Sequence, residues 1–230
     1  MPKSNVAESP AFDPRQGFYP RDIASRLADV SRKTMAEWDK KGIVPALIHW
    51  TDPRGRETPA YTFEGLVYLR LIRLLRQQKN SVPMRRIIVA VEYLVEKFGP
   101  PGPEWEGARI FSDGKRIWVD KPTLVSASDG GQIGSEVLLG KEFARFRARA
   151  DALLVPEDFL EWVEIQPSLR NGMPVVRGSG METRIIHAMF NQGMNERDVK
   201  ASYPFLSLTQ IRHGEGFEKY LDDRKLALAP

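Results

Sequence analysis

The run Gly99-Pro-Pro-Gly-Pro is the feature that most limits how this chain can fold. Proline has no amide hydrogen and its ring clashes with the preceding turn, so a helix cannot continue through this run. Before it, apolar residues recur at three- and four-residue spacing, whereas short extended runs separated by glycine turns follow it. The sequence therefore predicts a helical N-terminal domain that ends near residue 98, and a β-like unit after it.

Two short helices are predicted at the start of that domain. Residues 21–28 carry an apolar stripe typical of an amphipathic helix, and Ser31 is placed to cap a second helix over residues 32–41, which Gly42 ends. Two such helices joined by a tight turn form a helix-turn-helix, in which the N-terminal residues of the second helix face base edges.

A hairpin is predicted directly after the second helix. Its turn, Asp52-Pro-Arg-Gly, carries Arg54 and Arg56 at the tip. A basic hairpin in this position is typical of a wing that reaches the sugar-phosphate backbone. An isolated arginine pair would more often be an ordinary solvated hairpin, but the order of the elements favours the wing.

Two longer helices are predicted over residues 63–78 and 84–98. The first carries Arg70, Arg73 and Arg76 at three-residue spacing, a stripe that could contact phosphate or simply face solvent. The second has an almost entirely apolar run over 87–95, more than one intramolecular face needs. This excess predicts burial against the second domain or a partner subunit, and we expect a homodimer.

Positive charge is concentrated in this part of the chain. Residues 15–88 hold 15 Lys or Arg and 7 Asp or Glu, a net charge of +8, which leaves −4 for the rest of a chain whose total is +4. A localised positive field is what a DNA-binding face requires, because neutralising phosphates releases counterions. Charge alone would also fit a merely soluble basic surface.

The second half predicts smaller elements. Residues 109–119 and 123–137 suggest two β-hairpins, residues 141–154 a helix, 161–166 a strand, and 184–190, 196–201 and 208–221 three helices in a helix-turn-helix-like order. The predicted fold class is mainly α with small antiparallel β-hairpins. Its four parts are a flexible tail (1–17), a winged helix-turn-helix domain (18–98), a linker with the β-hairpin unit (99–140) and a small helical C-terminal domain (141–230).

Short motifs in the N-terminal domain carry a resemblance to a known family. They are Tyr19 with Ile23-Ala24, Val30-Ser-Arg-Lys-Thr-Met, Trp38, Lys41-Gly-Ile, Gly55-Arg and Ala60-Tyr-Thr. Together they resemble the winged-helix DNA-binding domain of MerR-type regulators, over residues 19 to about 95.

Motifs near the C-terminus carry a second resemblance. They are Gly172-Met-Pro-Val-Val-Arg-Gly-Ser-Gly, Thr183-Arg-Ile, Asn191-Gln-Gly-Met, Tyr203-Pro-Phe-Leu and Leu208-Thr-Gln-Ile. They resemble a small domain family of unknown function, DUF433, although Ser179-Gly-Met-Glu is inserted before Thr183 relative to its usual pattern. The pairing of both domains resembles antitoxins of the VapB type. This implies a repressor of its own operon that also neutralises a PIN-fold ribonuclease toxin.

The resemblance and the residue chemistry select the same candidate contacts with double-stranded DNA. Bases would be read from the start of the second helix, by Ser31, Arg32, Lys33 and Thr34. The phosphate backbone would be contacted by Arg21, Lys40, Lys41, Arg54 and Arg56. In the C-terminal domain Thr209, Gln210 and Arg212 hold the corresponding position, and that unit could contact DNA, bind a protein partner or dimerise.

Other function classes find little support. The absence of cysteine excludes disulfides, thiolate nucleophiles and cysteine-based metal sites, and His49, His187 and His213 have no ligand-like spacing. No phosphate loop or hydrolase motif is complete, so we expect no enzymatic activity, no cofactor and no metal. No apolar stretch reaches the roughly 18 residues of a membrane span, which favours a cytoplasmic protein without membrane contact. The remaining alternatives are a stand-alone winged-helix regulator without a toxin and a protein-interaction adaptor.

Overall fold

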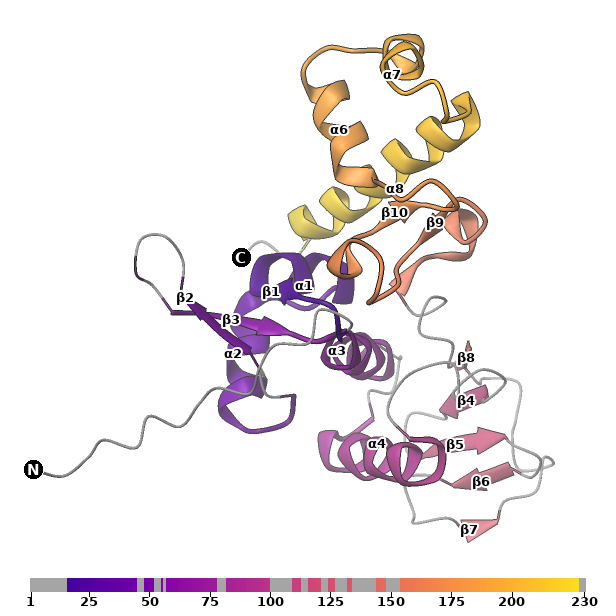
Figure 1. The fold of residues 1–230 in the computed structure, drawn as a ribbon. Helices are drawn as coiled ribbons and strands as arrows, with labels where there is room; N and C mark the ends of the chain where they lie inside the picture. The colour runs from indigo at the N-terminus through magenta and orange to yellow at the C-terminus, as the bar shows by residue number, and fades with distance from the viewer. Residues whose placement is uncertain are drawn as a thin grey trace, which may run out of the picture.

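The computed structural model shows a mainly helical chain with small antiparallel sheets (Figure 1). The part of the chain that it describes comprises residues 16–44, 48–51, 55, 57–77, 82–99, 109–112, 116–120, 124–126, 132–133, 144–147 and 154–227. Most of the tail predicted over residues 1–17 lies outside the described residues, as do Arg54 and Arg56 of the predicted wing tip.

The N-terminal elements comprise two helices joined by a short turn and a three-stranded antiparallel sheet, ordered β1-β3-β2. They are β1 (Tyr19–Pro20), α1 (Arg21–Ala28), α2 (Arg32–Lys40), β2 (Ile48–Thr51) and β3 (Glu57–Tyr61). Asp29 ends α1 in a left-handed conformation, φ 59°, and the Ser31 hydroxyl accepts a hydrogen bond from the Thr34 amide at 3.1 Å. The predicted cap and both predicted helices are confirmed, with boundaries within one residue.

Helices α3 (Phe63–Arg76) and α4 (Met84–Phe98) follow, and the predicted bounds of α4 are confirmed without change. The arginine stripe of α3 is divided between internal contacts and solvent: Arg70 is buried, Arg73 is half-buried and Arg76 is exposed. Arg70 and Arg73 lie 3.4 and 3.5 Å from the Asp29 carboxylate, and Arg76 donates to the Val82 carbonyl at 3.3 Å. Burial lowers the pKa of Arg70, and Asp29 opposes that change. Arg70 and Arg73 thus hold the turn between α1 and α2 against α3.

A five-stranded antiparallel sheet lies beside α4 (Figure 1). In spatial order it consists of β7 (Gln132–Ile133), β6 (Leu124–Ser126), β5 (Ile117–Asp120), β4 (Arg109–Ser112) and β8 (Ala144–Arg147). Both predicted hairpins are present, as β4-β5 and β6-β7, and they join into one sheet through β5 and β6. Ile117 is completely buried and attaches the sheet to the main core.

The helix predicted over residues 141–154 is wrong at residues 144–147. Residues 144–147 form β8, in which Phe146 lies opposite Ile110 of β4. The segment Ala-Arg-Phe-Arg alternates small or aromatic residues with arginines, a period of two that suits a strand. The free edge of β4 supplies the backbone partners, and that non-local pairing outweighs helix propensity.

The C-terminal unit combines a small sheet and three helices. The sheet, ordered β11-β10-β9, contains β9 (Val163–Glu164), β10 (Val175–Val176) and β11 (Met181–Glu182). The helices are α6 (Thr183–Asn191), α7 (Glu196–Ser202) and α8 (Leu208–Ala227), with short 3₁₀ turns at Glu157–Phe159 and Arg170–Gly172. Asn195 begins α7 with a capping box to Asp198, so the predicted cap is confirmed.

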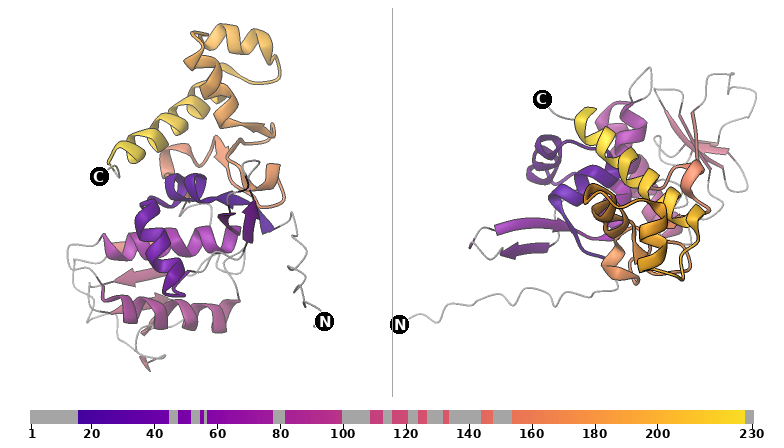
Figure 2. Two further views of the ribbon diagram at one scale, coloured as in Figure 1. Left: turned by 90° about the vertical axis from the view of Figure 1, so that its left-hand side faces the viewer. Right: turned by 90° about the horizontal axis from the view of Figure 1, so that it is seen from above.

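One continuous core joins the N-terminal and C-terminal parts of the chain. Buried Tyr19 and Leu27 belong to the same apolar cluster as Phe217 and Leu221 of α8. Helix α8 lies along α1, where Arg26 donates to Asp222 at 2.8 Å and to Glu218 at 3.1 Å (Figures 1 and 2). The change in sequence character after residue 98 is therefore not a break in the core.

Candidate nucleic-acid interface

Helix α2 presents a basic outer face. Its buried residues Met35 and Trp38 fix one side of the helix to the core. The opposite side exposes four cations and one carboxylate: Arg32, Lys33, Lys40, Lys41 and Glu37. The β2-β3 hairpin extends on the same side of the molecule as α2 (Figures 1 and 2). The structure thus brings four of the predicted DNA contacts together on one face beside the hairpin.

Ser31 and Thr34, predicted to read bases, are engaged at the start of α2. The Ser31 hydroxyl accepts from the Thr34 amide, and the two hydroxyl oxygens lie 2.8 Å apart. Both side chains are half-buried, whereas Arg32 and Lys33 between them are exposed. The cap orients the first turn, so the side chains best placed for base edges are Arg32 and Lys33.

Arg21, predicted to contact the DNA backbone, lies at the start of α1 beside α2. Its guanidinium is 3.4 Å from the Asp39 carboxylate, and both side chains are largely covered. Burial raises the pKa of the neighbouring Tyr61, and Arg21 opposes that rise. Arg21 therefore fixes the angle between the two helices in addition to carrying charge.

The predicted wing is present as a hairpin. Strands β2 and β3 pair from Ile48 opposite Ala60 to Thr51 opposite Glu57. Gly55 is exposed with φ 75°, a left-handed conformation that favours glycine in the loop. Arg54 and Arg56 flank it in sequence but lie outside the described residues, so their predicted contact with the backbone stays a prediction.

The side chains of two of the three C-terminal candidates, Gln210 and Arg212, bind neighbouring groups. Gln210 accepts from the Ser207 amide at 2.8 Å, and Arg212 binds Glu196 through two hydrogen bonds of 3.0 Å. The bond from Arg212 lowers the pKa of Glu196. Thr209 is exposed. Arg212 thus links α8 to α7, whereas Gln210 caps the start of α8.

Sequence reasoning missed the exposed apolar residues next to these candidates. Phe205, in the turn before α8, is 63% exposed, and Leu208, the first residue of α8, is 43% exposed. The motif Tyr203-Pro-Phe-Leu held a signal, since an aromatic residue between a proline and a capped helix start has few ways to be covered. We call Phe205 and Leu208 the apolar tip of the C-terminal unit. Its chemistry suits a protein contact more than a polyanion.

His187 and His213 both contact neighbouring side chains. His187 lies 2.9 Å from Glu215 and 3.2 Å from Asp222, and His213 stacks on Trp162 with ring centroids 4.8 Å apart. Among the described residues, no group of three or more His, Asp or Glu is placed to hold a metal ion. In the same part of the chain, no helix has the length and apolar character needed to cross a bilayer.

Comparison with known proteins adds a family for the C-terminal unit. Residues 163–214, from β9 into α8, match the family model described as "Protein of unknown function (DUF433)". The C-terminal unit is a DUF433 domain. A search of curated proteins found no match. Among solved structures, the crystal structure of Rv2018 from Mycobacterium tuberculosis is similar with a TM-score of 0.50 and 20% sequence identity, covering 85% of this chain and 96% of that chain. This similarity extends the fold beyond the DUF433 domain to most of the chain.

Proposed function

We propose that this protein binds double-stranded DNA through α2 and the β2-β3 hairpin, and that it represses its own promoter. The observation that carries the proposal is the pair Arg32 and Lys33, exposed on the first turn of a capped helix beside a hairpin. A helix of this size fits the major groove, where arginine or lysine can bind guanine, while a wing contacts the backbone. A homodimer reading two half-sites would double this contact.

Promoter binding is tested by fluorescence anisotropy with a duplex of the upstream region and a scrambled duplex, over a salt series. We expect the promoter to be preferred by about 1,000-fold or more, as for specific regulators. Arg32→Ala should remove most of that preference and cost about 1–3 kcal/mol. Arg197→Ala is the matched control, because Arg197 is exposed on α7, away from α2. Equal weak binding to both duplexes would contradict the proposal and favour a protein-interaction adaptor.

The second part of the proposal is that the DUF433 domain binds a protein partner, which we propose to be a PIN-fold ribonuclease toxin. The specific observation is the apolar tip, where Phe205 is 63% and Leu208 43% exposed, because aromatic side chains are enriched in protein interfaces. The toxin as partner follows from the resemblance to VapB-type antitoxins. A stand-alone regulator would bind DNA in the same way without this partner.

The partner is tested with the protein encoded by the adjacent gene. If that gene encodes a PIN-fold ribonuclease, we expect this protein to inhibit its RNA cleavage, and Phe205→Ser to weaken inhibition at least tenfold. Lys219→Ser is the control, since Lys219 is exposed on the same helix but away from the tip. Absence of a ribonuclease gene, or full inhibition by Phe205→Ser, would contradict the second part and leave the DNA-binding part standing.

A further inference from the structure

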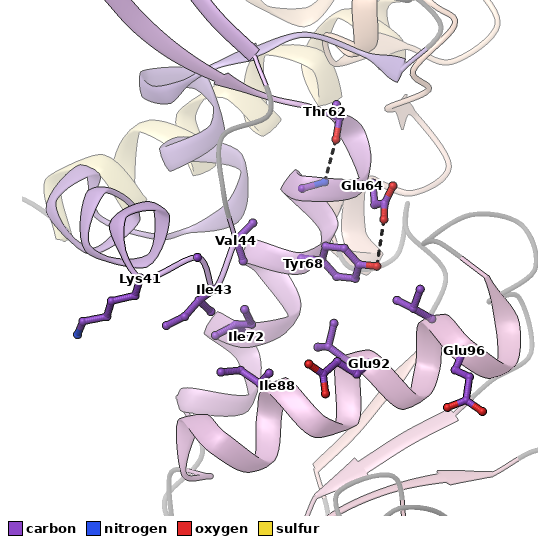
Figure 3. A pocket seen from close by; sticks show the side chains of 14 residues that line it. Lys41, Ile43, Val44, Thr62, Glu64, Tyr68, Ile72, Ile88, Glu92 and Glu96 are labelled. Atoms are coloured by element: carbon purple, nitrogen blue, oxygen red, sulfur yellow. Dashed lines mark hydrogen bonds between the residues drawn. The ribbon is translucent and has the colours of Figure 1, made fainter. Parts of the chain in front are cut away.

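A cavity of about 590 Å³ lies between α3 and α4 (Figure 3). This volume falls within the range of small-molecule sites. Most of its wall is apolar, formed by Ile43, Val44, Ile72, Ile88, Val91 and Val95. Three of these, Ile88, Val91 and Val95, belong to the apolar run of α4 and remain half-exposed in the folded chain. Part of the apolar excess that the sequence shows in this helix therefore lines a cavity, while Ile87 and Leu94 are buried in the main core.

Carboxylates dominate the polar part of the wall. Glu64 of α3 and Glu92 and Glu96 of α4 line the cavity, and Lys41 lies at its far end with the ammonium group directed away from them (Figure 3). Glu96 binds Lys97 at 3.2 Å, and Glu64 accepts a hydrogen bond from Tyr68 at 3.1 Å. Within the described part of the chain, Glu92 has no ion pair or hydrogen bond. Among the described residues, Glu64 and Glu92 thus line an apolar cavity without an ion pair to a cation, and Lys41 is directed away from them.

Burial and the neighbouring Glu64 carboxylate raise the pKa of Tyr68, so the Tyr68 hydroxyl stays protonated and donates to Glu64. An occupant that placed a positive charge between Glu64 and Glu92 would neutralise two like charges in a half-covered site. An anionic occupant would instead add a third negative charge. The cavity therefore favours a ligand that is both apolar and positively charged.

We infer that this cavity binds a small organic molecule with an apolar body and one cationic amine. A second copy of the chain is the main competing occupant. A symmetric contact centred on α4 would bring Glu92 and Glu96 toward the same residues of the partner, and like charges opposite each other disfavour it. An amine-bearing molecule meets the same apolar wall and neutralises those charges.

The inference is tested with three fluorescent probes that share one aromatic body: 1-pyrenemethylamine, 1-pyrenemethanol and 1-pyrenecarboxylate. Binding to the full chain is measured by anisotropy without DNA, so the result does not depend on the proposed function. We expect the amine to bind at least tenfold more tightly than the carboxylate. Ile88→Trp, which fills the cavity, should weaken binding of the amine and the alcohol at least tenfold.

Two further variants separate charge from folding. Glu92→Gln changes an exposed side chain and should reduce the preference for amine over carboxylate to about threefold or less. Glu161→Gln, an exposed glutamate before β9, is the matched control and should leave the preference unchanged. Equal affinity for all three probes, or amine binding that survives both Ile88→Trp and Glu92→Gln, would overturn the inference. So would a wild-type dimer by sedimentation velocity that binds no amine and that Ile88→Trp converts to monomer, because a second copy would then fill the cavity.

Discussion

Replacing Gly172 with alanine should strongly destabilise the chain where its two halves meet. Gly172 has φ 86°, and a Cβ atom there would lie 2.0 Å from the hydroxyl oxygen of Tyr19 and 2.5 Å from its Cζ. Tyr19 cannot easily move, because it is completely buried and its backbone pairs with Tyr61 in the β1-β3-β2 sheet. The Phe18 amide also donates to the Asn171 carbonyl at 2.9 Å, which fixes both segments.

Two terms set the magnitude. The left-handed conformation costs a residue with a Cβ about 1–2 kcal/mol, and overpacking a filled core costs about 1–3 kcal/mol. Gly172→Ala should therefore lower the free energy of unfolding by about 2–5 kcal/mol, or the melting temperature by about 2–4 °C for each kcal/mol.

Gly193→Ala separates these two terms. Gly193 has φ 87°, but an added Cβ would meet no atom within 4 Å. The control should lose only the backbone term, and Tyr19→Phe in the Gly172→Ala chain should recover part of the steric term by removing the nearest atom. Urea unfolding followed by tryptophan fluorescence measures all four proteins. A loss for Gly172→Ala no larger than that for Gly193→Ala would refute the close contact between Gly172 and Tyr19.

Three other predictions concern the cap of α2 and two ion pairs. Ser31→Ala removes the cap of α2 and should cost about 1 kcal/mol, measured by urea unfolding, whereas Ser31→Asp should keep the stability. Arg26→Met leaves the buried Glu218 carboxylate without its cation and should cost about 2–4 kcal/mol, less than a fully buried pair because 27% of the Arg26 side chain is exposed; an unchanged calorimetric melting temperature would contradict this. The lowered pKa of Glu196 means that its bond to Arg212 stabilises the fold at pH above the ordinary glutamate range, and that this contribution is lost as the pH falls through the lowered value. An NMR titration of Glu196 should show the lowered pKa in the wild type and its return toward the ordinary value in Arg212→Ala.

The sequence predicts the helices of the N-terminal domain well because their signals are local. Ser31 and Asn195 cap helices through contacts with residues three positions away, and such contacts can be predicted from spacing alone. Strand β8 could not be predicted in this way. Its pairing partner, β4, lies more than 30 residues earlier in the chain, and pairing with a distant edge decides its structure.

In the candidate site, too, features with local signals could be predicted and features that depend on distant contacts could not. The exposed face of α2 was predicted from charge and order, and four of its predicted residues do lie together. The inward position of Arg70 and Arg73 depends on Asp29, about 40 residues away, so helical spacing alone could not distinguish it from a solvated stripe. The cavity beside α4 likewise depends on how α3 and α4 pack, although the apolar excess of α4 was its visible trace.

Helix α8 works as a rigid spacer. Its 20 residues span about 30 Å, with the apolar tip at one end and the contacts to α1 nearer the other. A partner held at Phe205 and Leu208 is thus kept at a fixed distance from the helix-turn-helix instead of lying against it. The chain could then hold DNA and a partner protein at the same time, and a ternary complex, rather than exchange of one for the other, is the arrangement that this geometry allows.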